Sequence, residues 1–232
     1  MVSLRDNSIQ FFDSHAHQCS QETGGFYIGQ EGLPAFDGVM KNRDAVLIND
    51  VHNYKIGVEY VCSGFQQTHL NVVKYHPRRE KYTKDQVISD IASRRPKLVI
   101  IDTLNQPFWQ PLDYWKVAMA FPEIVFLMAH AGGYDVHEFV KMAHFTPNIF
   151  IDFSFTQHVF GVVGKEPTNK FIKDVMCFAV NNKVVRKKVL YGSDLPFASQ
   201  EEGLDFYAEE APFPEEIFCE NFKKIIHYLL SC

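Results

Sequence analysis

The sequence predicts an α/β fold built on a parallel sheet. Three observations lead to this prediction. Short apolar runs rich in Val, Ile and aromatic residues recur along the chain, stretches with helical periodicity separate them, and several runs end in a histidine or an aspartate. Strands that are apolar throughout are typical of parallel sheets, which are buried on both faces. The alternation of the two patterns predicts repeated strand–helix units.

Seven strands follow from the apolar runs: Ile9–Asp13, Gly57–Cys62, Asn71–Tyr75, Lys97–Asp102, Ile124–Ala129, Ile149–Phe153 and Lys188–Tyr191. An eighth could lie at Ala45–Asn49, although this segment reads better as helix. Seven to eight units predict a TIM-like (β/α) barrel. We expect a compact or distorted form, because such barrels typically need about 250 residues and this chain has 232.

Helices are expected between the strands, at Arg43–Tyr54, Thr83–Ser93, Leu112–Ala120, Val136–Ala143, Asn169–Val180 and Pro214–Leu230. Thr83 and Gln86 have the spacing of a capping box, and Pro111 suits a first helical turn. The glycine-rich segment Gln18–Asp37 predicts a long loop after the first strand. In a barrel such a loop covers the carboxyl-terminal mouth.

Composition predicts a single domain over residues 1–232. Hydrophobic residues make up 46% of the chain and charged residues 22%, and the net charge is -5. The negative charge gives no electrostatic case for binding nucleic acid or an anionic membrane. The first residues lack an apolar signal core, and no apolar run approaches the roughly 18 residues of a membrane span. Five scattered cysteines without Cys-x-x-Cys spacing predict reduced thiols in a cytoplasmic protein.

Residues suited to metal or proton chemistry stand at four predicted strand ends. His15 and His17 are two positions apart, so on a strand both imidazoles point to the same face and could hold one metal ion. Asp102, His130 and Asp194 follow three other strands. All strand carboxyl ends meet at one mouth of a parallel barrel, so these side chains are expected to converge.

Each of these residues also has a structural alternative. His15 and His17 could be surface histidines on a half-exposed strand. His130 could ligate metal or act as acid and base, or it could be a core histidine in the tight turn formed with the glycines that follow it. Asp194 could take a proton from water bound to a metal, or it could serve a turn or helix cap.

Five segments in order resemble the amidohydrolase-related family of the amidohydrolase superfamily. They are Asp-Ser-His-Ala-His at 13–17, Phe-Leu-Met-Ala-His-Ala-Gly-Gly at 126–133, Asn-Ile-Phe-Ile-Asp-Phe-Ser at 148–154, Leu-Tyr-Gly-Ser-Asp-Leu-Pro-Phe at 190–197 and the tail at 220–226. That family includes aminocarboxymuconate-semialdehyde decarboxylase and pyrone-dicarboxylate lactonase. The resemblance implies a distorted TIM barrel with one divalent metal, usually zinc or manganese, and an enzyme that hydrolyses or decarboxylates a small, carboxylated molecule.

By this resemblance His15 and His17 are metal ligands, Asp194 is ligand and general base, and His130 polarises the substrate or delivers a proton. Family members commonly carry another histidine ligand where this chain has Asp102. Asp102 could coordinate the metal and tilt its preference toward manganese or magnesium. The substitution also leaves two alternatives open: a metal-independent lactonase, and a non-catalytic barrel that binds a carboxylated ligand.

Substrate contacts are expected from three residues on neighbouring loops. His76 and Arg78 lie in a Lys-x-His-Pro element, where an arginine could fork onto a substrate carboxylate. Trp109 could wall a cyclic substrate or pack in the core. Asp152 is interpreted as a residue that orders the barrel mouth. Asp13 could hold a metal ligand through a hydrogen bond, or it could be buried with a backbone partner. The expected partner is a small-molecule substrate, and relatives in the family suggest a homodimer.

Overall fold

The computed structural model describes residues 12–16, 24–27, 72–81, 83–105, 107–156, 167–194, 197–198 and 200–230. The strands are β1 (Phe12–Ala16), β2 (Gly24–Tyr27), β3 (Val72–Tyr75), β4 (Leu98–Asp102), β5 (Val125–Ala129), β6 (Ile149–Asp152) and β7 (Val189–Leu190). The longer helices are α3 (Lys84–Arg94), α4 (Pro111–Met119), α5 (Val136–Phe145), α6 (Pro167–Asn181), α7 (Gln200–Glu210) and α8 (Asn221–Leu230). Shorter turns are α2 (Pro77–Glu80), η1 (His130–Asp135), η3 (Arg186–Lys188) and η4 (Glu216–Glu220).

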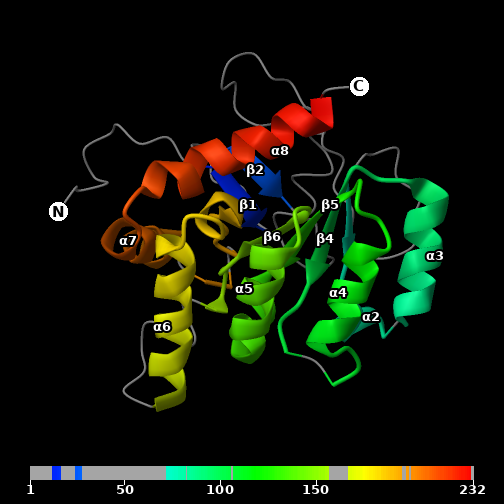
Figure 1. Cartoon of the computed structure of the whole chain (residues 1–232), viewed down its shortest axis with the longest axis horizontal. Helices are drawn as coiled ribbons and strands as arrows, with labels where there is room; N and C mark the ends of the chain where they lie inside the picture. Colours follow the sequence, from blue (N-terminus) through cyan, green and yellow to red (C-terminus); the bar gives the residue numbers. More distant parts are fainter. Residues whose placement is uncertain are drawn as a thin grey trace.

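Parallel strands form the centre of the molecule (Figure 1). Strands β3 to β7 pair side by side in sequence order, and β1 pairs with β2. Two backbone hydrogen bonds join these groups of strands: Ser14 N–H donates to the Tyr191 carbonyl at 2.8 Å, and Asp194 N–H donates to the His15 carbonyl at 2.7 Å. The first strand therefore lies against the segment that follows the last one.

The core has two layers because alternate residues of each strand face opposite sides of the sheet. On the outer side, β-strand residues such as Val99 and Phe126 pack against helices α3 to α7, and α3 to α6 stand side by side in Figure 1. On the inner side, residues such as Ile100 and Leu127 pack against apolar residues of α8. The inner layer is apolar at this depth, so polar side chains on this face lie nearer the strand ends.

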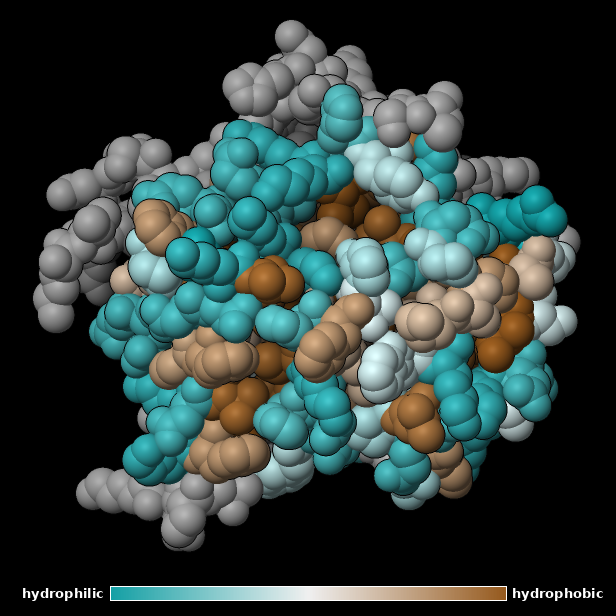
Figure 2. Space-filling view, viewed as in Figure 1, coloured by the Kyte–Doolittle hydropathy of each residue, from teal (hydrophilic) through white to brown (hydrophobic). Residues whose placement is uncertain are grey.

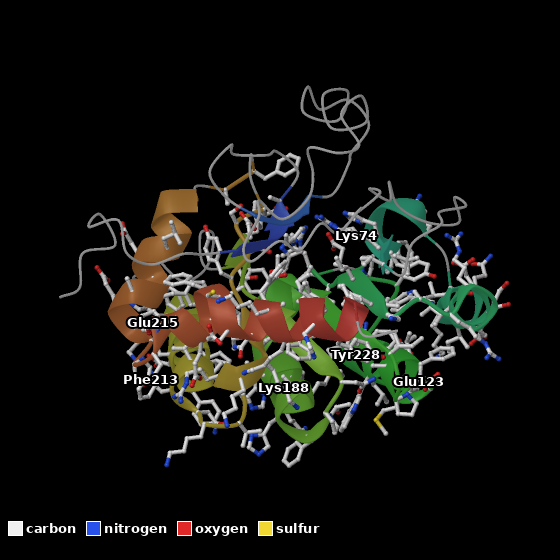
Figure 3. The ribbon with its side chains drawn as sticks, turned by 90° about the horizontal axis from the view of Figure 1, so that it is seen from above. Lys74, Glu123, Lys188, Phe213, Glu215 and Tyr228 are labelled. Atoms are coloured by element: carbon white, nitrogen blue, oxygen red, sulfur yellow. The ribbon has the colours of Figure 1, made fainter. Side chains whose placement is uncertain are left out.

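Helix α8 crosses the amino ends of the strands. Its Tyr228 hydroxyl donates to the carbonyl of Glu123, just before β5, at 2.5 Å, and Figure 3 shows these two residues next to each other. At its other end, the buried Asn221 amide donates to the carbonyls of Arg186 and Val189, at 2.8 and 2.9 Å. The opposite ends of the strands, where the polar residues gather, are therefore the ends that α8 does not cover.

An apolar hollow lies on the surface between α5 and α6. Its lining includes Phe145, Phe171 and Phe178, each more than half exposed, and its volume is about 510 Å³. Figure 2 shows hydrophobic side chains on this face, in the lower left of the view. Among the residues that the structure describes, no helix combines the length and the apolar character needed to cross a membrane.

The predicted parallel α/β fold is confirmed, and all observed strands except β2 overlap one of the predicted runs. The elements that were not predicted include β2 and α7. Residues 24–27 form β2 inside the predicted loop Gln18–Asp37, because they pair with the backbone of β1. Helix α7 escaped prediction because its acidic, glycine-containing sequence has weak periodicity, although its Phe206 and Tyr207 are buried. The expected elements Gly57–Cys62, Arg43–Tyr54 and Ala45–Asn49 lie outside the described residues.

The anchor of α8 can be tested at Asn221. Asn221→Ala leaves two buried carbonyls without their donor, so we expect it to lower the free energy of unfolding by about 1–3 kcal/mol. Asn181→Ala is the matched control, because Asn181 also donates to two carbonyls but is exposed; it should cost about 0.5 kcal/mol or less. Urea titration followed by circular dichroism measures both. Equal losses in the two variants would contradict this account of α8.

Candidate active site

Eight polar side chains converge at the carboxyl ends of the strands. Each is at most 6% exposed, and together they belong to β1, β3, β4 and β6 or to the turns after β3, β5, β6 and β7. They are His15, Lys74, His76, Asp102, His130, Asp152, Ser154 and Asp194. Polar groups buried to this degree must satisfy one another, because leaving a charge or a donor unpaired in the interior is costly.

Strand alternation explains how β3 contributes two of them. Val73 and Tyr75 face the outer core, so the residues between and after them, Lys74 and His76, face inward. Asp102 ends β4 on the same side as Ile100, which belongs to the inner layer. The inward faces of β3 and β4 thus change from apolar to polar at their carboxyl ends.

His15 connects the two sides of the cluster. Its Nδ1 lies 3.0 Å from the Ser154 hydroxyl, and its Nε2 lies 2.9 Å from Lys74 Nζ and 3.5 Å from Asp194 Oδ1. A protonated lysine can only donate, so the Nε2 lone pair accepts from Lys74 and Nδ1 carries the hydrogen. Burial, reinforced by the charge of Lys74, lowers the pKa of His15, which keeps the ring neutral.

Ser154 and Asp152 fix that orientation. The Ser154 hydroxyl accepts from His15 Nδ1 and donates to Asp152 Oδ1. The same carboxylate oxygen accepts from the backbone N–H of Ser154 at 3.0 Å and of His130 at 3.1 Å. Burial alone would raise the pKa of Asp152, but the nearby His15 ring, whose Nδ1 lies 3.8 Å from Asp152 Oδ2, together with His130 and Ser154, lowers it. Asp152 is therefore an anion that holds two histidines in place.

His130 has both ring nitrogens directed at acceptors. Its Nδ1 lies 2.8 Å from the carbonyl of Ser154, and its Nε2 lies 3.3 Å from Asp102 Oδ2. Two acceptors call for two N–H groups, which is the imidazolium form. Burial opposes that charge, but the hydrogen bond to Asp102 and the negative charge of Asp194 raise the pKa of His130 to about 9. The ring carries a fixed positive charge at neutral pH.

Asp102 balances this charge. Its Oδ2 receives three donors: His76 Nε2 at 3.0 Å, His130 Nε2 at 3.3 Å and an Arg78 nitrogen at 3.5 Å. Burial would raise the pKa of Asp102, but the hydrogen bonds from His130 and His76 hold it well below its usual value. The second oxygen, Oδ1, is buried and has no hydrogen-bond partner among the described residues. Metal coordination by Asp102 would have to use that oxygen.

The donor set fits a divalent cation. Ligand atoms of His15, His130 and Asp152 all lie within 4.8 Å of one another, although His130 would have to lose a ring proton before it could bind a metal. Asp152 Oδ2 is buried with no hydrogen-bond partner among the described residues. On the Nε2 side of His15, the 3.5 Å separation from Asp194 Oδ1 is close to the roughly 3.4 Å between two ligands of a tetrahedral zinc ion. His17, expected to be a ligand, lies outside the described residues.

Three further residues singled out in the sequence lie in different surroundings: at the edge of the cluster, in the core and at the contact of β1. Arg78 has a side chain that is 38% exposed and contacts Asp102. Trp109 is 5% exposed and packs on Tyr114, with ring centroids 5.0 Å apart, in the core between sheet and helices. This placement favours the packing alternative for Trp109. Asp13 accepts from Ser193 N–H and its hydroxyl, at 3.0 and 2.6 Å, so it ties β1 to the segment after β7.

Sequence reasoning missed Lys74 and Ser154 as members of the cluster. The signal for Lys74 was the alternation of β3, which puts it on the same face as His76. No comparable signal marked Ser154, because the turn after β6 sets its position and Phe155 has a positive φ of 62°. The structure brings His15, Asp102 and His130 together with Asp194, and their catalytic roles stay a prediction.

The described part of the chain is thus a parallel-stranded α/β fold with a buried histidine–aspartate cluster at its strand ends. A sequence profile described as amidohydrolase matches residues 61–225 of the chain. The match covers well over half of the sequence, and the chain belongs to the amidohydrolase family. The matched region contains Lys74, Asp102, His130 and Asp194, and it begins after His15.

Comparison with solved structures finds a similar fold in an uncharacterized TIM-barrel protein from Bordetella bronchiseptica. The TM-score is 0.51 at 14% sequence identity, and the match covers 68% of this chain and 58% of that protein. This likeness concerns the fold alone, and the chain spans less than two thirds of its neighbour. The search of curated proteins finds no match.

The pairing of Asp102 with His130 makes a measurable prediction. Asp102→Asn removes the carboxylate that favours the imidazolium, while the burial that opposes it remains. We therefore expect the pKa of His130 to fall from about 9 toward neutrality. NMR titration of the histidine ring signals in chelator-treated protein measures this, with the His130 signal assigned from a His130→Gln variant.

Asp174→Asn, at an exposed position of α6, is the matched control and should leave the His130 titration unchanged. A His130 pKa that stays near 9 in the Asp102→Asn variant would show that another group holds the proton.

Proposed function

We propose that this protein is a metal-dependent hydrolase that attacks the carbonyl group of a small, carboxylated organic molecule, an amide or a lactone. The observation that carries the proposal is the buried pair of His15 Nε2 and Asp194 Oδ1, 3.5 Å apart, at the strand ends of an amidohydrolase-family domain. A neutral imidazole and a carboxylate at this spacing suit one cation and one proton transfer.

His15 and Asp194, with His17 by its sequence spacing, would hold the cation. When bound, a divalent cation acts as a Lewis acid on water and on a carbonyl oxygen. Asp194 is the general base, because its carboxylate faces the His15 nitrogen and its backbone is fixed by the hydrogen bond to the His15 carbonyl. It takes a proton from the attacking water.

His130 serves the other half of the reaction. Its positive ring stabilises the negative charge that develops on the carbonyl oxygen. Its Nε2 proton can then pass to the leaving group, because the contact with Asp102 is long, at 3.3 Å. Asp102 and the Ser154 carbonyl keep the ring oriented from both nitrogens. The ring therefore acts as an electrostatic group first and as a proton donor second.

Arg78 is the residue we assign to the substrate carboxylate. Its side chain is 38% exposed, and one guanidinium nitrogen is oriented by Asp102. A guanidinium has five N–H donors in a plane and binds carboxylates in a forked arrangement. His76, which also contacts Asp102, would hold the anchor of Arg78 in place. The family resemblance also allows decarboxylation, and the homodimer suggested by relatives stays a proposal.

A metal-independent lactonase is the second candidate. The observation that favours it is Lys74, whose Nζ lies 2.9 Å from His15 Nε2 and supplies a positive charge there without a metal. The two candidates differ in what chelation does to turnover.

Turnover should depend on Asp194. We expect Asp194→Asn to lower kcat by about 10²-fold or more, the usual contribution of a general base, on whichever amide, lactone or carboxylated ring-cleavage product a screen identifies. Asp205→Asn, at an exposed position of α7, is the matched control and should turn over normally. Elemental analysis of protein purified without added metal or chelator should find about one zinc or manganese per chain, and less in His15→Ala.

Three results would distinguish the metal-dependent hydrolase from a metal-independent lactonase and from a non-catalytic barrel. Unchanged turnover in Asp194→Asn would remove the proposed base. Full turnover after chelation would favour the metal-independent lactonase. Ligand binding without turnover on any substrate would leave a non-catalytic barrel.

A further inference from the structure

Lys74 occupies an unusual position for a lysine. Its residue is only 3% exposed, it sits inside β3 between two residues of the outer core, and its amine reaches His15 Nε2 at 2.9 Å. Figure 3 shows Lys74 on the side of the molecule where β1 lies. Burying an ammonium group costs several kcal/mol unless other groups compensate it. One compensating contact is the hydrogen bond to His15 Nε2, and the carboxylate of Asp194 lies 3.5 Å from the same nitrogen.

The nitrogen that Lys74 contacts is the ring atom suited to a metal. His15 Nδ1 donates its hydrogen to Ser154, so the lone pair of the ring is on Nε2. That lone pair faces both Lys74 Nζ, at 2.9 Å, and Asp194 Oδ1, at 3.5 Å. A metal ion would bond to the same lone pair at about 2.0–2.1 Å. One lone pair cannot serve both partners.

We propose that Lys74 is an internal cation that competes with a divalent metal ion for His15 Nε2. In the metal-free protein its ammonium group occupies the lone pair and offsets the negative charge of Asp194. When a metal ion binds, the amine gives up this contact, because two cations beside one nitrogen repel each other. This inference rests on the proposed function only in that a divalent metal binds at His15.

Competition of this kind sets two properties of the site at once. It weakens metal affinity, because binding must first displace the hydrogen bond from Lys74. It also keeps the metal-free site folded, because His15 and Asp194 retain a positive partner. A lysine with a purely structural role would stabilise the metal-bound and metal-free forms equally. It would therefore leave metal affinity unchanged.

The test uses Lys74→Met, which keeps the length of the side chain and removes its charge. The full chain is stripped with chelator and titrated with zinc against a chromogenic chelator. We expect Lys74→Met to bind zinc at least about 10-fold more tightly than the wild type, which corresponds to about 1.4 kcal/mol. Lys74→Arg, which retains a positive charge, should not bind more tightly than the wild type.

Lys188→Met is the matched control. Lys188 is also partly buried, but its amine donates to the carbonyls of Ala143 and Thr146, at 2.6 and 2.8 Å, away from the cluster. Figure 3 shows it well separated from Lys74. Its substitution should cost stability and leave zinc affinity unchanged.

Thermal unfolding gives a second readout. Without zinc, Lys74→Met should unfold at a lower temperature than the wild type, and saturating zinc should raise its Tm by more than it raises that of the wild type. Equal losses of Tm with and without zinc would mean that Lys74 is only structural. If Lys74→Met folds only with zinc, the zinc titration is made on Lys74→Gln, which also removes the charge, and the same tighter binding is expected.

The failures are distinguishable. Zinc binding by the wild type with equal or weaker binding by folded Lys74→Met would overturn the competition and leave the proposed function standing. No zinc binding by the wild type or by Lys74→Met would overturn both the competition and the metal dependence.

Discussion

The contact between β1 and the segment after β7 is the constraint on which the site depends. Two backbone hydrogen bonds make it, Ser14 to Tyr191 and Asp194 to His15, and the second directly joins two residues assigned to the chemistry. Gly192 allows the close approach, because a Cβ atom there would lie 3.1 Å from Asp152 Cγ and 3.2 Å from His15 Cβ. Residues from opposite ends of the chain therefore meet within the cluster, and neither end can form it alone.

Once these strands meet, the hydrogen bonds leave little freedom in the protonation of the two central histidines. His15 receives from Lys74 and gives to Ser154, so it is neutral. His130 faces acceptors at both nitrogens, so it is charged. The rings are only 4.7 Å apart between centroids, where two positive charges would repel strongly. The different partners of the two rings are the reason why we assign His15 to the metal and His130 to the stabilisation of negative charge.

Much of the fold could be predicted because strands such as β4 and β5 are uninterrupted apolar runs. A strand that is buried on both faces needs apolar residues at successive positions. The polar ends of those runs, Asp102 and His130, were found for the same reason. The partners of these residues could not be found in this way. Ser154 reaches both histidines only because the chain turns after β6, and Asp102 receives three donors from other elements. Such contacts depend on the tilt and register of the strands, which local patterns do not contain.

Backbone strain is concentrated where the chemistry is assigned. Among the described residues, two of the non-glycine residues with positive φ, Lys81 and Arg95, are ordinary helix caps. The others follow strands at the cluster and include His130 at 68° and Asp194 at 60°. Such conformations cost of order 1–3 kcal/mol each and persist only where other bonds enforce them. His130 is held at its N–H by Asp152 and at its carbonyl by Thr156. The strained turns direct these side chains into the cluster, so stability is given up locally to place the groups to which we assign the reaction.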